Sequence, residues 1–365
     1  MMRVVLVDDE APARARLTAL LRELDGVQVV GEADNADAAR AVVAALTPDV
    51  VFLDIEMPAE RGTDLAASLP EPRPFIVFAT AYERFAVDAF QYDAADYLLK
   101  PVTRPRLLAT IERLRQKLAH RQDTNRELAD AVRAQAHLLA RALPDVSGYE
   151  LAARTLPARV VGGDFYDTAA IDGRLVFVLG DVSGKGMAAG LIASSVQARW
   201  ETAVRLRDLS LAAMMASLNR DVIASTEGSR YATLVHGVLT PATGELRYVS
   251  AGHPDAVLVA ADGRWSLGLA STAPAVGLID GAEFPSAVHT MLAGDTLVLM
   301  SDGVCEARDG AGCELDLARI AALATAHRLL PPAALADAIV HEVQTHRGTD
   351  QGQDDVTVFI LRRTA

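Results

Sequence analysis

The sequence predicts a chain of two folded parts joined by a long helix. The first part is an α/β domain with a parallel sheet, and the second is an α+β domain with a β-sandwich flanked by helices. The chain has 365 residues, which is too long for one ordinary domain. Apolar strand-like runs alternate with amphipathic helical stretches as far as residue 118, and after residue 147 short strands follow one another through turns containing glycine and aspartate.

The N-terminal part contains strand-like runs separated by helical stretches. Such alternation predicts a parallel sheet covered on both faces, because each crossover places a helix against the sheet. We expect the strands at Arg3–Val7, Val27–Ala33, Asp49–Leu53, Pro74–Thr80 and Asp96–Leu99. Ligands bind beyond the carboxyl ends of strands in such folds, and the polar residues expected there are Asp8, Asp9, Asp54, Thr80 and Lys100.

A long helix is expected from Pro105 to Leu143, since proline suits a first helical turn and Pro144 ends the helix. Two positions of a seven-residue repeat run through it and are mostly apolar, which is typical of a coiled-coil seam, and Asn125 is a polar residue of the kind that fixes register. We expect a homodimeric coiled coil over residues 105–144. The alternative is a monomeric helix that packs this face against its own domains. The repeat positions hold Leu107, Ile111, Leu114, Leu118, Arg121, Asn125, Leu128, Val132, Gln135, Leu139 and Ala142.

The C-terminal part, residues 147–365, is expected to be mainly antiparallel. Hairpin-type turns at Thr243–Leu246 and Ala261–Trp265 join neighbouring strands. We expect helices at Met187–Leu206, Leu209–Ser225, Glu314–His327 and Pro332–His346. The expected strands are Glu150–Arg154, Leu175–Leu179, Ala232–Leu239, Leu246–Ala251, Ala256–Val259, Thr296–Met300 and Val356–Leu361.

Composition excludes several classes of protein. The formal net charge of −13 argues against a nucleic-acid-binding protein. The chain has two cysteines, Cys305 and Cys313, which make no disulfide framework and fit a reducing compartment. No apolar stretch reaches membrane-spanning length, and the N-terminus lacks a signal-peptide pattern. We therefore expect a cytoplasmic protein with no membrane partner.

Several apolar runs end in aspartate, which places carboxylates on rigid strand ends. Two carboxylates about 4 Å apart repel by roughly 4 kcal/mol at an effective dielectric of 20, so a cluster of them needs a cation. Asp8, Asp9 and Asp54 follow the first and third strands, which are neighbours in the expected sheet. Their oxygen atoms suit Mg²⁺. Lys100 adds a positive charge for a phosphate, and Thr80 adds a hydroxyl.

Residues 1–120 resemble a bacterial response-regulator receiver domain. The resemblance rests on the segments VDDE, FLDIEMP, FATAY and DYLLKP. It implies a flavodoxin-like, five-stranded parallel sheet in which a sensor histidine kinase phosphorylates Asp54. It also implies that Asp9, Asp54 and the backbone carbonyl of Glu56 bind Mg²⁺, with Asp8 acting partly through water.

The same resemblance assigns the residues that respond to phosphorylation. Lys100 pairs with the phosphate, and its peptide bond to Pro101 is expected to be cis. Thr80 turns towards the phosphoryl group, and Tyr97 swings inward. A local electrostatic change of this kind biases a surface between two states.

Aspartates also lie beside strands or tight glycine turns in the C-terminal part. They come from segments far apart in the sequence: Asp164, Asp181, Asp302 and Asp354. A set of oxygen ligands suits Mg²⁺ or Mn²⁺ rather than Zn²⁺. Several carboxylates can hold two ions about 3.5–4 Å apart, which activate water for hydrolysis, so no protein nucleophile is needed.

Residues 147–365 resemble the PPM, or protein phosphatase 2C, family in its bacterial SpoIIE-like and RsbU-like branch. The segments VVGGDFYD, GDVSGKGMAAGL, SAGHP, MSDGVCEA and QDDVTVFI appear in family order. The resemblance implies two Mn²⁺ or Mg²⁺ ions and a phosphoserine or phosphothreonine substrate. Asp181 would bridge both ions, the Val182 carbonyl would bind one, and Asp302 and Asp354 would complete the other. Asp164 would act through a water molecule on a metal ion.

Other residues in these segments have two interpretations. Asp355 is a secondary ligand candidate, because relatives often have asparagine at this position. Lys185 is either a solvated loop residue or a ligand of the substrate phosphate. Structural roles are expected for Asp167, His253 and Cys305.

We therefore predict a response regulator whose output is a metal-dependent protein phosphatase controlled by Asp54. By family analogy, the substrate is a phosphorylated anti-sigma-factor antagonist. The alternative is a non-catalytic adaptor that binds a sigma-regulatory partner, which the presence of all the principal aspartates disfavours. A transcription factor is disfavoured by the acidic charge and by the absence of a helix-turn-helix or basic stretch.

Overall fold

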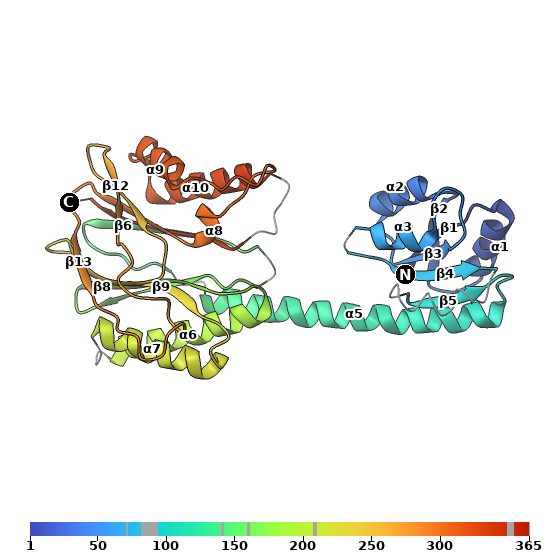
Figure 1. The fold of residues 1–365 in the computed structure, drawn as a ribbon, viewed down its shortest axis with the longest axis horizontal. Coiled ribbons are helices and arrows are strands. Elements are labelled where there is room, and N and C mark those ends of the chain that lie inside the picture. Colours follow the sequence, from blue (N-terminus) through green and yellow to red (C-terminus); the bar gives the residue numbers. More distant parts are fainter. Residues whose placement is uncertain are drawn as a thin grey trace. The chain divides into compact units, whose positions relative to one another are not determined.

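The structure is a computed structural model, and its residues form two compact units, Met1–Glu127 and Leu128–Ala365 (Figure 1). It describes residues 1–70, 72–81, 94–139, 142–158, 161–206, 210–348 and 354–364, without the side chains of residues 128, 132, 134–139 and 206. Each unit is considered by itself. Within the described residues, no helix is both long enough and apolar enough to cross a membrane.

The N-terminal unit contains the predicted five-stranded parallel sheet, in the order β2-β1-β3-β4-β5. Its strands are β1 (Met2–Val7), β2 (Val27–Ala33), β3 (Val50–Asp54), β4 (Phe75–Thr80) and β5 (Asp96–Leu99). The described helices are α1 (Ala11–Arg22), α2 (Ala36–Leu46), α3 (Gly62–Ser68) and α5 (Arg104–Leu139). Every residue of β3 is buried, as expected for a strand covered on both faces.

The strand order brings the two aspartate-bearing strands together. Strand β1 pairs with β3 in parallel, with Val7 opposite Leu53. The residues that follow Val7 and Leu53 therefore leave the sheet at the same edge, which places Asp8 next to Asp54. This edge is where the fold class predicts a ligand.

Helix α5 belongs to the core of the N-terminal unit over its first turns. Leu107, Ile111 and Leu114 are at most 1% exposed, and Leu118 is 9% exposed, within the hydrophobic cluster that includes the sheet. This part of the predicted coiled-coil seam is wrong, because these side chains already pack inside their own unit. Asn125, further along, is exposed.

The end of α5 also differs from the prediction. The described helix ends at Leu139 rather than Leu143, residues 140 and 141 lie outside the described residues, and Leu143 packs against a core cluster of the C-terminal unit. The side chains at the later positions of the seven-residue repeat, residues 128, 132, 135 and 139, are likewise outside the described part of the chain. The homodimer therefore stays a prediction.

Truncating Leu114 to alanine is expected to destabilise the N-terminal unit by about 2–5 kcal/mol, because a fully buried leucine leaves a cavity. Denaturant unfolding of the full chain, followed by a probe in this unit, measures the change. Leu108→Ala is the matched control, since Leu108 lies on the same helix but is 43% exposed. Equal losses in the two variants would contradict the core assignment of α5.

The C-terminal unit is the predicted β-sandwich flanked by helices. One sheet has the order β13-β10-β9-β8-β7, and the other has the order β12-β11-β14-β15-β6. Figure 1 shows α6 and α7 against the first sheet and α9 and α10 against the second. The strands are β6 (Tyr149–Leu156), β7 (Phe165–Ile171), β8 (Arg174–Val182), β9 (Ala232–Thr240), β10 (Glu245–Ala251), β11 (Ala256–Val259), β12 (Trp265–Gly268), β13 (Ala287–Thr290), β14 (Thr296–Met300) and β15 (Val356–Arg363).

Side-chain alternation along β8 explains why this sheet has two buried faces. Phe177 and Leu179 point into the cluster between the sheets, whereas Val176 and Val178 belong to the cluster under α6 and α7.

The helices are α6 (Met187–Leu206), α7 (Leu211–Thr226), α8 (Asp302–Cys305), α9 (Leu317–Ala326) and α10 (Pro332–Arg347). Three edge strands, β7, β12 and β13, were not among the expected strands. Strands β12 and β13 each have only four residues, with exposed side chains.

Candidate functional site

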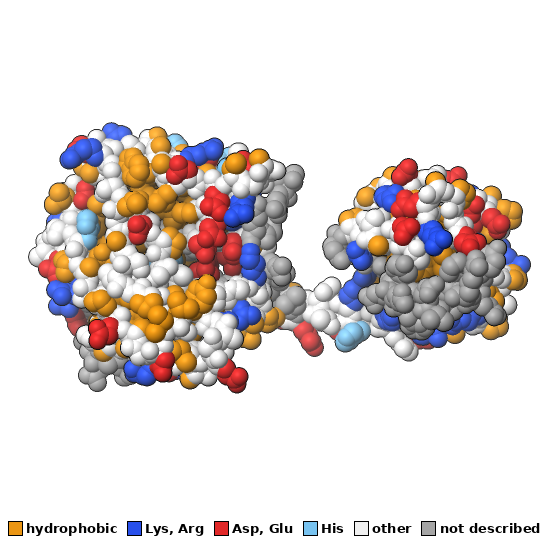
Figure 2. All heavy atoms as spheres, viewed as in Figure 1, with side chains coloured by type: hydrophobic (Ala, Val, Ile, Leu, Met, Phe, Trp, Pro, Cys, Tyr) orange, Lys and Arg blue, Asp and Glu red, His pale blue; other side chains and the backbone are white. Residues whose placement is uncertain are grey.

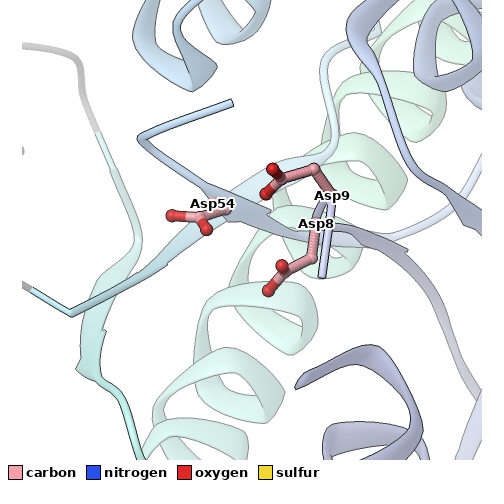
Figure 3. Close-up of side chains that lie close together, drawn as sticks. All are labelled: Asp8, Asp9 and Asp54. Atoms are coloured by element: carbon pink, nitrogen blue, oxygen red, sulfur yellow. The ribbon is translucent and has the colours of Figure 1, made fainter. Parts of the chain in front are cut away.

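The N-terminal unit brings three carboxylates together at the carboxyl edge of its sheet. Asp8, Asp9 and Asp54 each offer a carboxylate oxygen, and these oxygens lie within 4.8 Å of one another (Figure 3). Lys100 Nζ lies 2.6 Å from Asp54 Oδ2 and 2.7 Å from Asp8 Oδ2. One ammonium group against three carboxylates leaves the cluster short of positive charge, and its oxygen donors fit Mg²⁺.

Burial and hydrogen bonding shift the pKa values of two members of this cluster, Asp54 and Lys100. Burial raises the pKa of Asp54, although the hydrogen bond from Lys100 opposes that rise. Burial alone would lower the pKa of Lys100, but its hydrogen bonds to Asp54 and Asp8 outweigh this effect and raise it. Lys100 therefore stays cationic beside the carboxylate predicted to accept a phosphoryl group.

The predicted switch residues surround the same edge. The Thr80 hydroxyl is buried and has no hydrogen-bond partner among the described residues, so it is available to a new acceptor. Tyr97 is partly buried against the core, and Glu56 donates its backbone N–H to Asp54 Oδ1 at 3.2 Å. The peptide bond between Lys100 and Pro101 is cis, as expected.

The C-terminal unit gathers its aspartates where ends of both sheets meet. Asp181 lies near the end of β8 and Asp164 precedes β7, in one sheet. Asp302 follows β14 and Asp354 precedes β15, in the other sheet. Figure 2 shows acidic side chains concentrated on one face of this unit.

The buried Asp164 and the half-buried Asp181 form the centre of this acidic group. Asp164 Oδ2 accepts a hydrogen bond from the Ser301 hydroxyl at 2.7 Å, while the buried Oδ1 has no hydrogen-bond partner in the described part of the chain. Burial raises the pKa of Asp181, and Asp164, Asp302 and Asp354 raise it further. A buried carboxylate oxygen that has no hydrogen-bond donor and lies among other carboxylates fits a divalent cation.

The spacing of this group differs from that at the first site. Among the described residues of the C-terminal unit, no three acidic side chains bring ligand oxygens within 4.8 Å of one another. The two-ion arrangement, with Asp181 at the centre, therefore stays a prediction.

Backbone atoms also approach the acidic group closely. A side chain at Gly163 would place its Cβ atom 2.7 Å from the Val182 carbonyl oxygen and 3.2 Å from an Asp181 carboxylate oxygen. Only glycine allows the loop to lie there. The Val182 carbonyl thus sits beside the proposed bridging carboxylate.

The structure changes the role assigned to Asp355. Its carboxylate accepts the backbone N–H groups of Ala158 and Gly163, at 2.8 and 2.7 Å. We therefore assign Asp355 to holding the loop that reaches Asp181 rather than to the proposed ligand set. Asp354 instead faces Lys185, whose Nζ lies 3.1 Å from Asp354 Oδ2.

Sequence reasoning missed the role of Ser301. Its hydroxyl donates to Asp164 and accepts the backbone N–H of Thr357 at 2.9 Å, so it links Asp164 to the neighbouring strand. Its place beside Asp302 was the available signal. The expected structural residues are buried or half-buried: Asp167 accepts from Gln197, His253 contacts Thr233, and Cys305 contacts Met300.

The pKa of Asp302 predicts a pH dependence of stability. Burial, followed by the charge of Asp354, raises this pKa to about 6. An unfolded aspartate titrates near pH 3.9, so between about pH 4 and pH 6 the native state binds more protons, and stability falls as pH rises. We expect the thermal midpoint of cation-free protein to fall over this interval. Asp302→Asn should reduce the slope, and an unchanged slope would contradict the assignment.

Family models match both units. The stage II sporulation protein E (SpoIIE) model matches residues 171–364, and the response regulator receiver domain model matches residues 4–112. The transcriptional regulatory protein BtsR of Salmonella typhi is 48% identical over 118 residues, which are 32% of this chain and 49% of BtsR. An uncharacterized response regulatory protein of Yersinia pestis is 45% identical over 134 residues, covering 36% of this chain and 56% of that protein. The chain spans about half the length of these curated relatives.

Solved structures resemble the C-terminal unit. The RsbU and RsbW domains of a Mycobacterium tuberculosis protein are 30% identical, with a TM-score of 0.55, covering 61% of this chain and 62% of that one. The SiaA-PP2C domain of Pseudomonas aeruginosa is 19% identical, with a TM-score of 0.58, covering 67% of this chain and 98% of that one, and shows likeness of fold. In this chain a response regulator receiver domain precedes a PPM-type domain, and the chain therefore belongs to the SpoIIE family.

Proposed function

We propose that the chain is a response regulator whose output is a metal-dependent phosphoserine/phosphothreonine protein phosphatase. The observation that carries this proposal is the acidic group of Asp164, Asp181, Asp302 and Asp354, which two sheets bring together in a SpoIIE-family domain. The divalent cations, two Mn²⁺ or Mg²⁺ ions, would supply Lewis acidity and an activated water. The protein would hold the ions through Asp181, Asp302, Asp354 and the Val182 carbonyl.

The remaining residues of this site orient the ligands. Ser301 holds one oxygen of Asp164, which leaves the other oxygen facing the site. Asp355 fixes the glycine loop against Asp181. Lys185 lies beside Asp354, where its ammonium group could contact a substrate phosphate.

Control of this activity is proposed to begin at Asp54. A sensor histidine kinase would supply the phosphoryl group, and Mg²⁺ at Asp8, Asp9, Asp54 and the Glu56 carbonyl would neutralise it. The buried Thr80 hydroxyl has no current partner among the described residues, which fits a residue that turns towards a phosphoryl oxygen. Helix α5, in a homodimer formed beyond the receiver core, would carry the change to the phosphatase domain.

The proposed substrate is a phosphorylated anti-sigma-factor antagonist. The support is the family resemblance, together with the likeness to the RsbU and RsbW domains of the Mycobacterium tuberculosis protein. An antagonist left untouched while other phosphoproteins are hydrolysed would exclude this substrate.

Purified full-length protein tests the proposal with a serine-phosphorylated substrate, in the presence and absence of Mn²⁺ and of beryllofluoride as a phosphoryl mimic. We expect turnover that requires Mn²⁺ and changes with the mimic. Folded protein that binds Mn²⁺ but shows no turnover in either state would favour the non-catalytic adaptor. Light scattering tests the homodimer, and a monomeric mass would exclude it under those conditions.

A further inference from the structure

Arg347 ends helix α10 with its side chain buried rather than solvated. It is 5% exposed and continues an apolar face of the helix formed by Leu335, Ile339 and Val343, which precede it at four-residue spacing. A buried guanidinium group is costly unless hydrogen bonds compensate it. The partners of Arg347 therefore indicate its role.

Two of those partners are backbone carbonyls of residues at or beside the proposed metal ligands. Arg347 Nη1 donates to the carbonyl oxygen of Asp354 at 2.9 Å, and Nη2 donates to the carbonyl oxygen of Gly303 at 2.8 Å. Gly303 follows Asp302 directly. A guanidinium fork can hold two separate chain segments in this way, whereas the compact ammonium group of lysine cannot reproduce the same geometry.

The two segments lie close together and carry like charges. A Cβ atom on Gly303 would lie 1.9 Å from the carbonyl oxygen of Asp355, so the backbones are in direct contact. One segment carries the Asp302 carboxylate, and the other carries the Asp354 carboxylate. The two carboxylates repel each other. Unless the two segments are held together, this repulsion would widen the site and move the ligands out of place for a cation.

We propose that Arg347 is a positioning residue that sets the affinity of the phosphatase domain for divalent cations. It holds the Asp302–Gly303 and Asp354–Asp355 segments together through their backbone carbonyls. This inference rests on the proposed function, because it requires Asp302 and Asp354 to bind the cation. Arg347 is itself no ligand, but it keeps Asp302 and Asp354 close to each other before the cation binds.

Calorimetric titration with Mn²⁺ tests the proposal in the full chain. All proteins carry Asp9→Ala, which weakens the receiver site and isolates binding by the phosphatase domain. Arg347→Met is expected to raise the Mn²⁺ dissociation constant by at least about tenfold, as loss of groups that orient ligands typically does. Arg347→Lys, which keeps the charge but loses the fork, should fall between this variant and its parent.

Arg362→Met is the matched control. Arg362 is also buried, at 9% exposure, and donates to Thr296 Oγ1 at 2.9 Å and to the Leu330 carbonyl at 2.6 Å, neither of which belongs to the acidic group. It should lower the thermal midpoint without changing the Mn²⁺ dissociation constant. That contrast separates positioning of the ligands from general stabilisation.

Each outcome decides the question. Unchanged Mn²⁺ binding in Arg347→Met, or an equal loss in Arg362→Met, would overturn the role of Arg347 while leaving the proposed phosphatase intact. A parent protein that binds no Mn²⁺ would instead overturn the proposed function. If Arg347→Met does not fold, Arg347→Lys decides: weakened Mn²⁺ binding with the parental thermal midpoint supports the inference, and parental binding rejects it.

Discussion

Replacing Asp302 with alanine is expected to lower kcat/KM for a phosphoserine substrate by about 1000-fold, because a bound metal ion supplies several kcal/mol of transition-state stabilisation. Asp302 lies at the start of α8, and its charge is among the causes that raise the pKa of Asp181. Removing its carboxylate also removes a repulsion, so the fold should survive. Steady-state assays at several Mn²⁺ concentrations measure the effect.

The control for this experiment is Asp280→Ala. Asp280 is an exposed aspartate in the same unit and is absent from the acidic group. It should keep wild-type turnover and Mn²⁺ dependence. Retained activity with unchanged metal dependence in Asp302→Ala would refute the ligand assignment.

Replacing Asp54 with alanine is expected to abolish the response of the phosphatase to beryllofluoride while leaving its basal metal-dependent turnover intact. Asp54 is the carboxylate that Lys100 contacts at 2.6 Å, and in the proposed control it is the residue that accepts the phosphoryl group. The measurement is the ratio of turnover with and without the mimic. We expect this ratio to become one in the variant.

Asp64→Ala provides the comparison for Asp54. Asp64 is exposed on α3, in the same unit, and should preserve the wild-type ratio. A response in Asp54→Ala equal to that of the wild-type protein would contradict phosphorylation control at this residue. Loss of basal turnover as well would show that the substitution acts on the fold rather than on signalling.

The fold could be predicted from periodicity where strands are buried on both faces. The runs that became β3 and β8 are continuously apolar, and their burial follows from that composition. Edge strands such as β12 and β13 lack this signal because half-exposed, four-residue segments resemble loops. The sequence also indicated which aspartates approach one another. Asp54 ends the buried strand β3, and Asp181 lies near the end of the buried strand β8.

Other features depended on contacts between distant segments. Asp354 and Asp355 are adjacent and chemically identical, but one faces Lys185 and the other binds the amides of a loop. No local pattern distinguishes them. The coiled-coil prediction for the first turns of α5 failed for a related reason. An apolar helix face indicates that something packs against it, but it does not tell a second chain from the sheet of its own domain, against which Leu107 and Leu114 pack.

The burial of Leu118 in the receiver core has a consequence for how such proteins evolve. A gene fusion that exchanged the output domain at the start of α5 would remove leucines that the receiver needs in order to fold. A viable exchange point must therefore lie beyond Leu118, where the described side chains of residues 119–127 are mostly exposed. Recombination between these modules is then expected within the helix rather than at its first turns.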